Sequence, residues 1–333
     1  MMGIWFFAKL PLLRSKLREV IFVSSDTASI VTQMAMLFAL IAVGYICKKA
    51  HYTNDEVDTG LSKVVINVAM PSLILSAVLA EHEPLSLEEI GITFFSCLAM
   101  MALLVALAFI VVAVMRVPNG FKGAYRFMLA FGNVGFLGFP VIAAIYGQSA
   151  LIYASIFQVP FNLLCYTVGP ILVAKDSEDV QPEKVTIKTF LTPMTICCLA
   201  AIALEAGDVQ EIPIATDIFT LLGNMATPAA MIIIGSQMAN MPLRDLAGTP
   251  RLWGMSAFRL VINPIIVWLL FSPILDSHLL LGALVVSSAM PVANVGVMFS
   301  LLYGTDTKTL SQGIIISTLL SMVTIPLLVI AMG

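Results

Sequence analysis

The stretch "AFGNVGFLGFPVIAAIYG", residues 130–147, is apolar enough to cross a membrane, yet it is a poor candidate for an uninterrupted helix. It holds three glycines spaced three apart from Gly132 onward, with Asn133 beside the first and Pro140 after the last. In a helix interior a glycine costs about 1 kcal/mol and a proline about 3 kcal/mol relative to alanine. We therefore expect a break in this segment, made by the glycines rather than by Pro140.

The composition of the whole chain is that of a protein embedded in lipid. Of its 333 residues 59% are hydrophobic and 11% charged, and the mean hydropathy is +1.00. Soluble domains are about 25% charged, so the only class that fits is a polytopic membrane protein. The net charge of -3 makes nucleic acid an unsuitable partner. The five cysteines fall in or beside apolar runs without metal-ligand spacing, so we expect no metal site.

Apolar runs of spanning length predict an all-α fold. A hydrocarbon core about 30 Å thick needs roughly 20 apolar residues per helix, and ten runs meet this requirement. An even number of spans places both termini on the same side. The expected spans are Thr27–Cys47, Leu61–Leu79, Ile90–Met115, Phe127–Tyr146, Ala150–Val173, Val185–Leu204, Ile218–Met238, Trp253–Phe271, Leu279–Tyr303 and Leu310–Ala331.

Lysines and arginines are confined to alternate loops. The other loops carry none and hold acids instead, as in "EHEPLSLEE" after the second span. Basic loops face the cytoplasm, so we predict a multi-pass protein of the cytoplasmic (inner) membrane with both termini outside. The tail 1–26 carries basic residues on the wrong side, and it is either an interfacial helix or the product of an early start codon. The basic residues of the loops are Lys48, Lys49, Lys63, Arg116, Lys122, Arg126, Lys175, Lys184, Lys188, Arg244, Arg251 and Lys308.

An internal repeat is visible at an offset of 157 residues. "NVAMP" beginning at Asn67 corresponds to "NMATP" beginning at Asn224, and the Tyr-Gly pair at Tyr146 corresponds to that at Tyr303. The repeats would be 27–174 and 185–333, joined by a cytoplasmic linker at 175–184. Because each repeat holds an odd number of spans, the two would be inverted. In secondary transporters with inverted repeats, sites lie near the midplane where helices are broken.

The candidate site lies where the fourth and ninth spans are interrupted. In the ninth span the interruption is "SSAMPVANVG", residues 287–296, and at the offset of 157 Pro291 corresponds to Val134. Freed N–H groups and half-helix N-termini favour an anion there. Glycine packing and a simple proline kink are the structural alternatives. The expected substrate-binding residues are Gly132, Asn133, Val134, Gly135, Pro291, Val292, Asn294 and Gly296.

Three further polar residues are candidates for lining the pathway: Asn67, Asn224 and Arg259. Asn67 and Asn224 could instead accompany helix kinks, and Arg259 could extend to the cytoplasmic surface. No acidic residue lies at mid-membrane, since Glu205 and Asp217 fall at outer ends where we expect them to be solvated. We expect no cofactor, while coupling to sodium or to protons stays open, as does uniport.

At these residues the chain resembles the auxin efflux carrier family, which includes plant PIN-type carriers and bacterial malate- and malonate-type permeases. The resembling stretches are "LSKVVINVAMPSLILSAVLA", "GNVGFLGFPVIAAIYG" and "SSAMPVANVGVMFSLLYG". The resemblance implies a fold related to bile acid:sodium symporters. Spans 1, 2, 6 and 7 would form a scaffold domain, and spans 3–5 and 8–10 a transport domain. It also implies organic-anion binding where the broken spans cross, and elevator-type alternating access. Gly132 stands where plant members tend to have proline.

The leading hypothesis is a secondary transporter of a small mono- or dicarboxylate. A sodium-coupled symporter of the bile acid type is the alternative, distinguishable by sodium-dependent uptake. An enzyme is disfavoured because no catalytic motif lies within the spans, and a membrane sensor because no effector domain is attached. The expected partners are the organic anion and the lipid bilayer, with a homodimer left open. Substrate identity, direction and coupling ion are beyond the sequence.

Overall fold

The computed structural model describes residues 31–80, 84–177, 192–209, 212–240 and 248–332, which are almost entirely helical. By length and composition, seven helices in these ranges could cross a membrane, and three apolar helices are shorter. The prediction of an all-helical membrane protein is confirmed for these ranges, whereas the ten-span inverted repeat stays a prediction. The tail 1–26 and most of the linker lie outside the described residues. The long helices are Val31–Lys49, Asp55–Leu79, Leu87–Val114, Gln148–Ala174, Pro213–Ala239, Pro250–Phe271 and Thr307–Met332; the shorter are Val134–Tyr146, Pro193–Ala206 and His278–Ser288.

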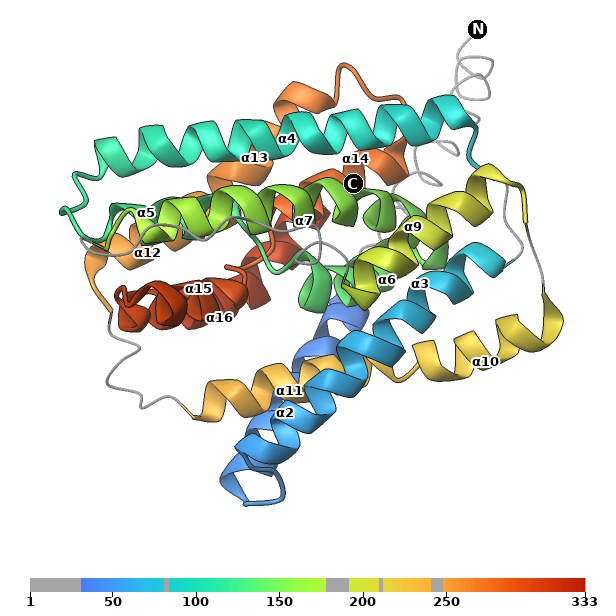
Figure 1. Ribbon diagram of the computed structural model, residues 1–333, viewed down its shortest axis with the longest axis horizontal. Helices are drawn as coiled ribbons and strands as arrows, with labels where there is room; N and C mark the ends of the chain where they lie inside the picture. The colour runs from blue at the N-terminus through green and yellow to red at the C-terminus, as the bar shows by residue number, and fades with distance from the viewer. Residues whose placement is uncertain (1–30, 81–83, 178–191, 210–211, 241–247, 333) are drawn as a thin grey trace, which may run out of the picture.

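Several of these helices consist of consecutive pieces, of which Figure 1 labels the α-helical ones. In the first half, after the helix Val31–Lys49, they are α2 (Asp55–Val64), η1 (Val65–Ala69), α3 (Met70–Leu79), α4 (Leu87–Val114), α5 (Lys122–Ala130), η2 (Val134–Gly138), α6 (Phe139–Tyr146), η3 (Gln148–Ala150) and α7 (Leu151–Ala174). In the second half they are α9 (Pro193–Ala206), α10 (Pro213–Gly223), α11 (Ala226–Ala239), α12 (Pro250–Ala257), η5 (Phe258–Ile262), α13 (Asn263–Phe271), α14 (His278–Ser288), α15 (Val295–Tyr303) and α16 (Thr307–Met332).

Side-chain caps set where helices begin. Asn54 accepts a hydrogen bond from the Val57 N–H at 2.8 Å, so α2 starts well before the expected Leu61. Ser86 and Glu89 form a capping box at the start of α4. Hydropathy alone places a helix start at the first apolar residue, whereas a polar cap extends the helix beyond the membrane.

Three π-helical turns each end two residues before a proline. Proline lacks an N–H and clashes with the carbonyl four residues earlier, and a π-turn changes the local hydrogen-bond pattern so that the helix continues. The expected kinks are therefore accommodated inside continuous helices. The pairs are η1 with Pro71, η2 with Pro140, and η5 with Pro264.

The helices pack as two neighbouring groups (Figure 1). In one group α4 lies against α5 and α7, and α16 lies against α12 and α15. In the other, α3 packs on α9 and α10, and α11 packs on α2. The helices α7 and α9 join the groups.

One expectation about the outer ends of the helices is wrong. Glu205 at the end of α9 is buried rather than solvated, and its Oε1 accepts a hydrogen bond from the Leu85 N–H at 2.6 Å. Proximity to a loop does not guarantee exposure, because the segment before α4 folds over this carboxylate. Asp217 is exposed, as expected.

Candidate functional site: the crossing of two interrupted helices

The two interrupted segments lie against each other through their backbones. Helix α5 ends at Ala130 and η2 begins at Val134, while α14 ends at Ser288 and α15 begins at Val295. Between these ends, Gly132 and Val292 form an isolated antiparallel bridge. The break therefore coincides with Gly132, and Pro140 lies inside the helix Val134–Tyr146.

Two backbone hydrogen bonds hold the crossing. The Asn133 N–H donates to the Pro291 carbonyl at 2.7 Å, and the Ala293 N–H donates to the Phe131 carbonyl at 3.1 Å. Backbone groups released by the two breaks thus satisfy each other, as a low-dielectric environment requires.

The pairing gives the register of the crossing, while the offset of 157 between the repeats stays a prediction. The bridged residues Gly132 and Val292 are 160 positions apart, and Pro291 lies opposite Asn133. The offset of 157 relates equivalent positions of the two repeats, such as Tyr146 and Tyr303, and does not state which residues pair across the crossing.

Two cavities lie at the N-terminal ends of the half-helices. The larger has a volume of about 350 Å³ and the smaller about 280 Å³. Asn133, Gln237 and Asn294 line both, so these three amides lie where the cavities meet. Neither lining includes a charged side chain among the described residues. Polarity at this position comes from amides, hydroxyls and the helix N-termini.

Five of the eight expected site residues line the larger cavity. They are Gly132, Asn133, Val134, Gly135 and Asn294. The other three, Pro291, Val292 and Gly296, are buried and line neither cavity.

Those three residues have structural contacts instead. Pro291 provides the carbonyl for the crossing, and the Val292 N–H donates to Ser317 Oγ at 3.0 Å. A Cβ on Gly296 would overlap the ring of Phe127, so this glycine permits packing. Sequence spacing identified the interrupted segment but not which side of it faces open space.

The glycines of the quoted stretch have different roles. A Cβ on Gly132 would overlap Nη2 of Arg259. At Gly135 the nearest atom would be Cε of Met194 at 3.5 Å, which is ordinary contact. Of these two glycines, only Gly132 has a neighbouring atom too close to leave room for a Cβ.

Gln158 on α7 is a cavity residue that the sequence analysis did not single out. It is 4% exposed, and its Nε2 donates to Asn162 Oδ1 at 2.7 Å. Asn162 Nδ2 in turn donates to Thr195 Oγ1 at 2.7 Å. The Gln158 Oε1 is buried without a partner among the described residues and lies beside Gly135. The signal was available, since two amides four positions apart share one face of an apolar helix.

None of the candidate pathway residues lines either cavity. Asn67 is exposed and donates to the Lys63 carbonyl at 2.8 Å, and Asn224 is exposed between α10 and α11. Arg259 is fully buried and also lines neither cavity. Its Nε donates to the Met290 carbonyl at 2.8 Å.

No group of three or more His, Cys, Asp or Glu side chains within the described ranges is arranged to hold a metal ion. What the geometry offers is a polar, uncharged recess at a helix crossing. Such a recess can bind a small polar or anionic molecule.

Comparison with known proteins assigns the chain to a class. A family profile described as "Membrane transport protein" matches residues 29–329. An "Uncharacterized transporter" of Methanothermobacter thermautotrophicus is 26% identical over 87% of this chain and 94% of its own length. An "Uncharacterized transporter" of Methanocaldococcus jannaschii is 23% identical over 88% and 95%, respectively. A "Putative malonate transporter" of Rhizobium meliloti is 23% identical over 86% and 91%. The chain therefore belongs to the membrane transport protein family, that of the auxin efflux carriers.

Proposed function

We propose that this membrane transporter is a secondary carrier of a small organic anion, which binds where the two interrupted helices cross. One observation carries the proposal: the backbones of α5–η2 and α14–α15 bridge at Gly132 and Val292, beside two cavities that share Asn133, Gln237 and Asn294. The N-terminal ends of η2 and α15 lie at these shared amides.

The chemistry of this recess favours an anion. The first N–H groups of a helix have no intrahelical acceptor, and the N-terminus carries about half a positive charge. Asn133 Oδ1 accepts from the Phe136 N–H at 3.2 Å, so its Nδ2 is oriented away from that bond and available to a ligand. A carboxylate can therefore be bound without desolvating a lysine or arginine.

Gln158 adapts the larger cavity to either hydrogen-bond polarity. If both amides of the Gln158–Asn162 pair rotate by half a turn, Asn162 donates to Gln158 and the Thr195 hydroxyl donates to Asn162. The chain of hydrogen bonds is preserved, and the free end of Gln158 becomes an NH₂ rather than an oxygen. The cavity can thus accept a carboxylate oxygen or a hydroxyl.

Cavity size and the relatives favour a mono- or dicarboxylate. A volume of about 350 Å³ is at the small end of the range for ligand sites. The relative of Rhizobium meliloti carries malonate in its name, and we propose the same class of small carboxylate here.

The larger cavity lies near basic residues that the sequence assigns to the cytoplasmic side. Its lining includes Ser62, which precedes Lys63 in α2, and Thr192, which follows Lys184 and Lys188 in the sequence. With the basic loops in the cytoplasm of an inner membrane and both termini outside, the cavities would open inward. Alternating access would follow from an elevator-like shift of the group containing α4–α7 and α12–α16. This group would move against the other group, which contains α2, α3 and α9–α11 and would be the scaffold.

The test is uptake of labelled malonate and monocarboxylates into proteoliposomes by Asn133→Asp. This isosteric variant keeps the oxygen that accepts from Phe136 but loses the amide donors and adds a repelling charge. We expect at least about a tenfold loss of transport with an unchanged unfolding temperature, because truncating a site built to hydrogen-bond a substrate leaves its polar groups unpaired.

The matched control is Asn224→Asp, an exposed asparagine outside both cavities that should transport normally. Wild-type rates in Asn133→Asp would disprove the site. An absence of uptake for every carboxylate in the wild-type protein would disprove the substrate class.

A further inference from the structure

Arg259 is a buried cation that pairs with backbone rather than with an acid. It lies in η5, in the middle of the helix Pro250–Phe271, and its exposure is 0%. Both ion pairs found within the described ranges belong to Lys48. Burying an unpaired charge in a membrane is expensive, so such residues usually contribute to function or to assembly.

Three backbone carbonyls surround the guanidinium. Nη1 donates to the Met128 and Leu129 carbonyls at 2.9 and 2.8 Å, and Nε donates to the Met290 carbonyl at 2.8 Å. Nη2 lies where a Cβ on Gly132 would have to stand. The neighbouring Asn263 donates to the same Leu129 carbonyl at 3.2 Å.

These carbonyls belong to the C-terminal ends of the two half-helices. Met128 and Leu129 lie in the last turn of α5, and Met290 follows the end of α14 at Ser288. A helix C-terminus carries about half a negative charge. Two of them meeting at one point amount to about one negative charge, which a single guanidinium neutralises.

In transporters with broken helices, unwound carbonyls and half-helix C-termini are where a coupling Na⁺ is held. Here the corresponding carbonyls are occupied by a side chain of the protein itself. We infer that Arg259 is a built-in cation that takes the place of a coupling metal ion, so that the crossing is assembled, and the anion bound, independently of sodium.

This inference rests on the proposed function and concerns whether transport of the anion is coupled to sodium. Arg259 acts as a positioning residue, since it lines neither cavity and reaches the ligand only through the backbone it holds. A fixed cation stays in place through the transport cycle, whereas a bound Na⁺ must be exchanged at each turnover. Transport would then be driven by the gradient of the anion itself.

The first measurement uses the unaltered protein and needs no substrate. The unfolding temperature of the purified transporter is compared in sodium chloride and in choline chloride at equal ionic strength. We expect no difference, because a ligand stabilises a folded state only if it binds that state. A sodium-specific rise in the unfolding temperature would overturn the inference.

The second measurement is rescue of Arg259→Ala by a free cation of the same shape. We expect at least about a tenfold loss of transport, since removing one partner leaves buried polar groups uncompensated. Millimolar guanidinium should restore most of that loss, while urea, which is planar but neutral, should not. Restoration by sodium instead of guanidinium, or wild-type rates in Arg259→Ala, would overturn the inference.

Asn263→Ala is the matched control. Asn263 contacts the same Leu129 carbonyl without carrying a charge, so its alanine variant should show no rescue by guanidinium. If Arg259→Ala does not fold, the sodium comparison on the unaltered protein still decides. A sodium-specific rise in the unfolding temperature would overturn the inference about Arg259, but it would not affect the test of the binding site by Asn133→Asp. Conversely, a wrong substrate class would leave the sodium independence of folding untouched.

Discussion

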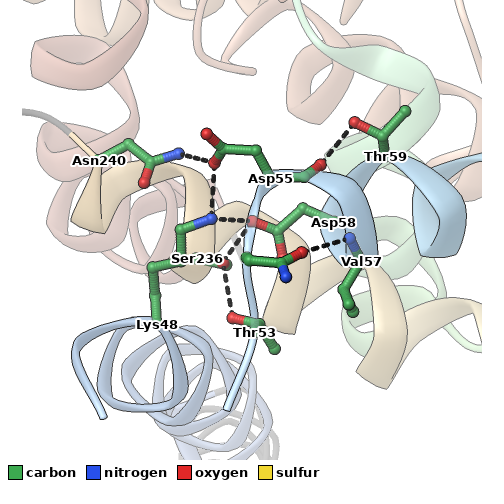
Figure 2. Close-up of polar contacts among 9 residues, drawn as sticks. Lys48, Thr53, Asp55, Val57, Asp58, Thr59, Ser236 and Asn240 are labelled. Carbon is green, nitrogen blue, oxygen red and sulfur yellow. Dashed lines mark hydrogen bonds and ion pairs between the residues drawn. The ribbon is translucent and has the colours of Figure 1, made fainter. Parts of the chain in front are cut away.

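Lys48 and Arg259, both within the described part of the chain, are withdrawn from water to different degrees and are neutralised in different ways. Lys48 Nζ forms ion pairs with Asp55 Oδ1 and Asp58 Oδ2, both at 2.7 Å (Figure 2). Arg259 contacts three carbonyls and no carboxylate among the described residues. The Lys48 side chain keeps 11% of its surface exposed, whereas Arg259 keeps none.

The Lys48 cluster joins three helices at one end. Lys48 belongs to the helix Val31–Lys49, and the two aspartates belong to α2. Ser236 Oγ of α11 donates to Asp58 Oδ2 at 2.7 Å, and Asn240 Nδ2 donates to Asp55 Oδ1 at 2.7 Å (Figure 2). In these four contacts of Lys48, Asp55 and Asp58, both partners are side chains.

The difference follows from depth. At a helix end, water solvates part of an acid, so placing a carboxylate there costs little. In the middle of a span a carboxylate would need its own desolvation, a penalty that can exceed the attraction. The broken helices supply negative partial charge from carbonyls that are already buried, so the crossing can neutralise a cation without a second ionisable group.

The largest effect should come from crowding the cation at the crossing. Gly132→Ala places a methyl group against Nη2 of Arg259, so the guanidinium has to shift relative to the carbonyls that Nη1 and Nε contact. Displacing a buried charge from its partners costs about 3–5 kcal/mol. We therefore expect a large fall in unfolding temperature in detergent.

Gly135→Ala is its control, because the new Cβ would lie 3.5 Å from Met194 Cε and should be tolerated. Equal unfolding temperatures for the two variants would mean that the crossing does not depend on the guanidinium.

A smaller effect is expected in the Lys48 cluster. Asp58→Asn removes one of two carboxylates from Lys48, while Asp55 remains. Asp58 is 6% exposed, so we expect a loss of about 1–3 kcal/mol, the usual cost of an impaired buried polar contact. Thermal unfolding measures it. A loss of stability as large as that of Gly132→Ala would show that the ion pairs of Lys48 tolerate disruption no better than the carbonyl contacts of Arg259 do.

The smallest effect belongs to the exposed carboxylate. The Asp55 side chain is 82% exposed, so Asp55→Asn should lower the unfolding temperature less than Asp58→Asn does. Because salt screens exposed charges, the difference from wild type should shrink at high ionic strength. A loss of stability that persists in molar salt would show that Asp55 contributes as a buried carboxylate does, like Asp58.

Particular residues show how far the sequence could be interpreted. The interruption near Gly132 was predictable because glycine and asparagine weaken a helix wherever they occur. The register of the crossing was not, because the bridge of Gly132 to Val292 joins two segments far apart in the chain, and no local pattern specifies which of their residues pair. Gln158 was missed although Asn162, four positions on, shares its helix face, because the sequence does not show that this face borders a cavity.

The sequence by itself determined that this is a multi-pass, all-helical membrane protein with broken segments, because hydropathy and backbone propensity are local properties. The tertiary structure alone decided which groups those breaks serve. It directed the half-helix N-termini toward the cavities with Asn133 and Asn294 and their C-termini toward Arg259. That division depends on contacts between residues more than a hundred positions apart, and no local pattern encodes the direction in which a freed backbone group points.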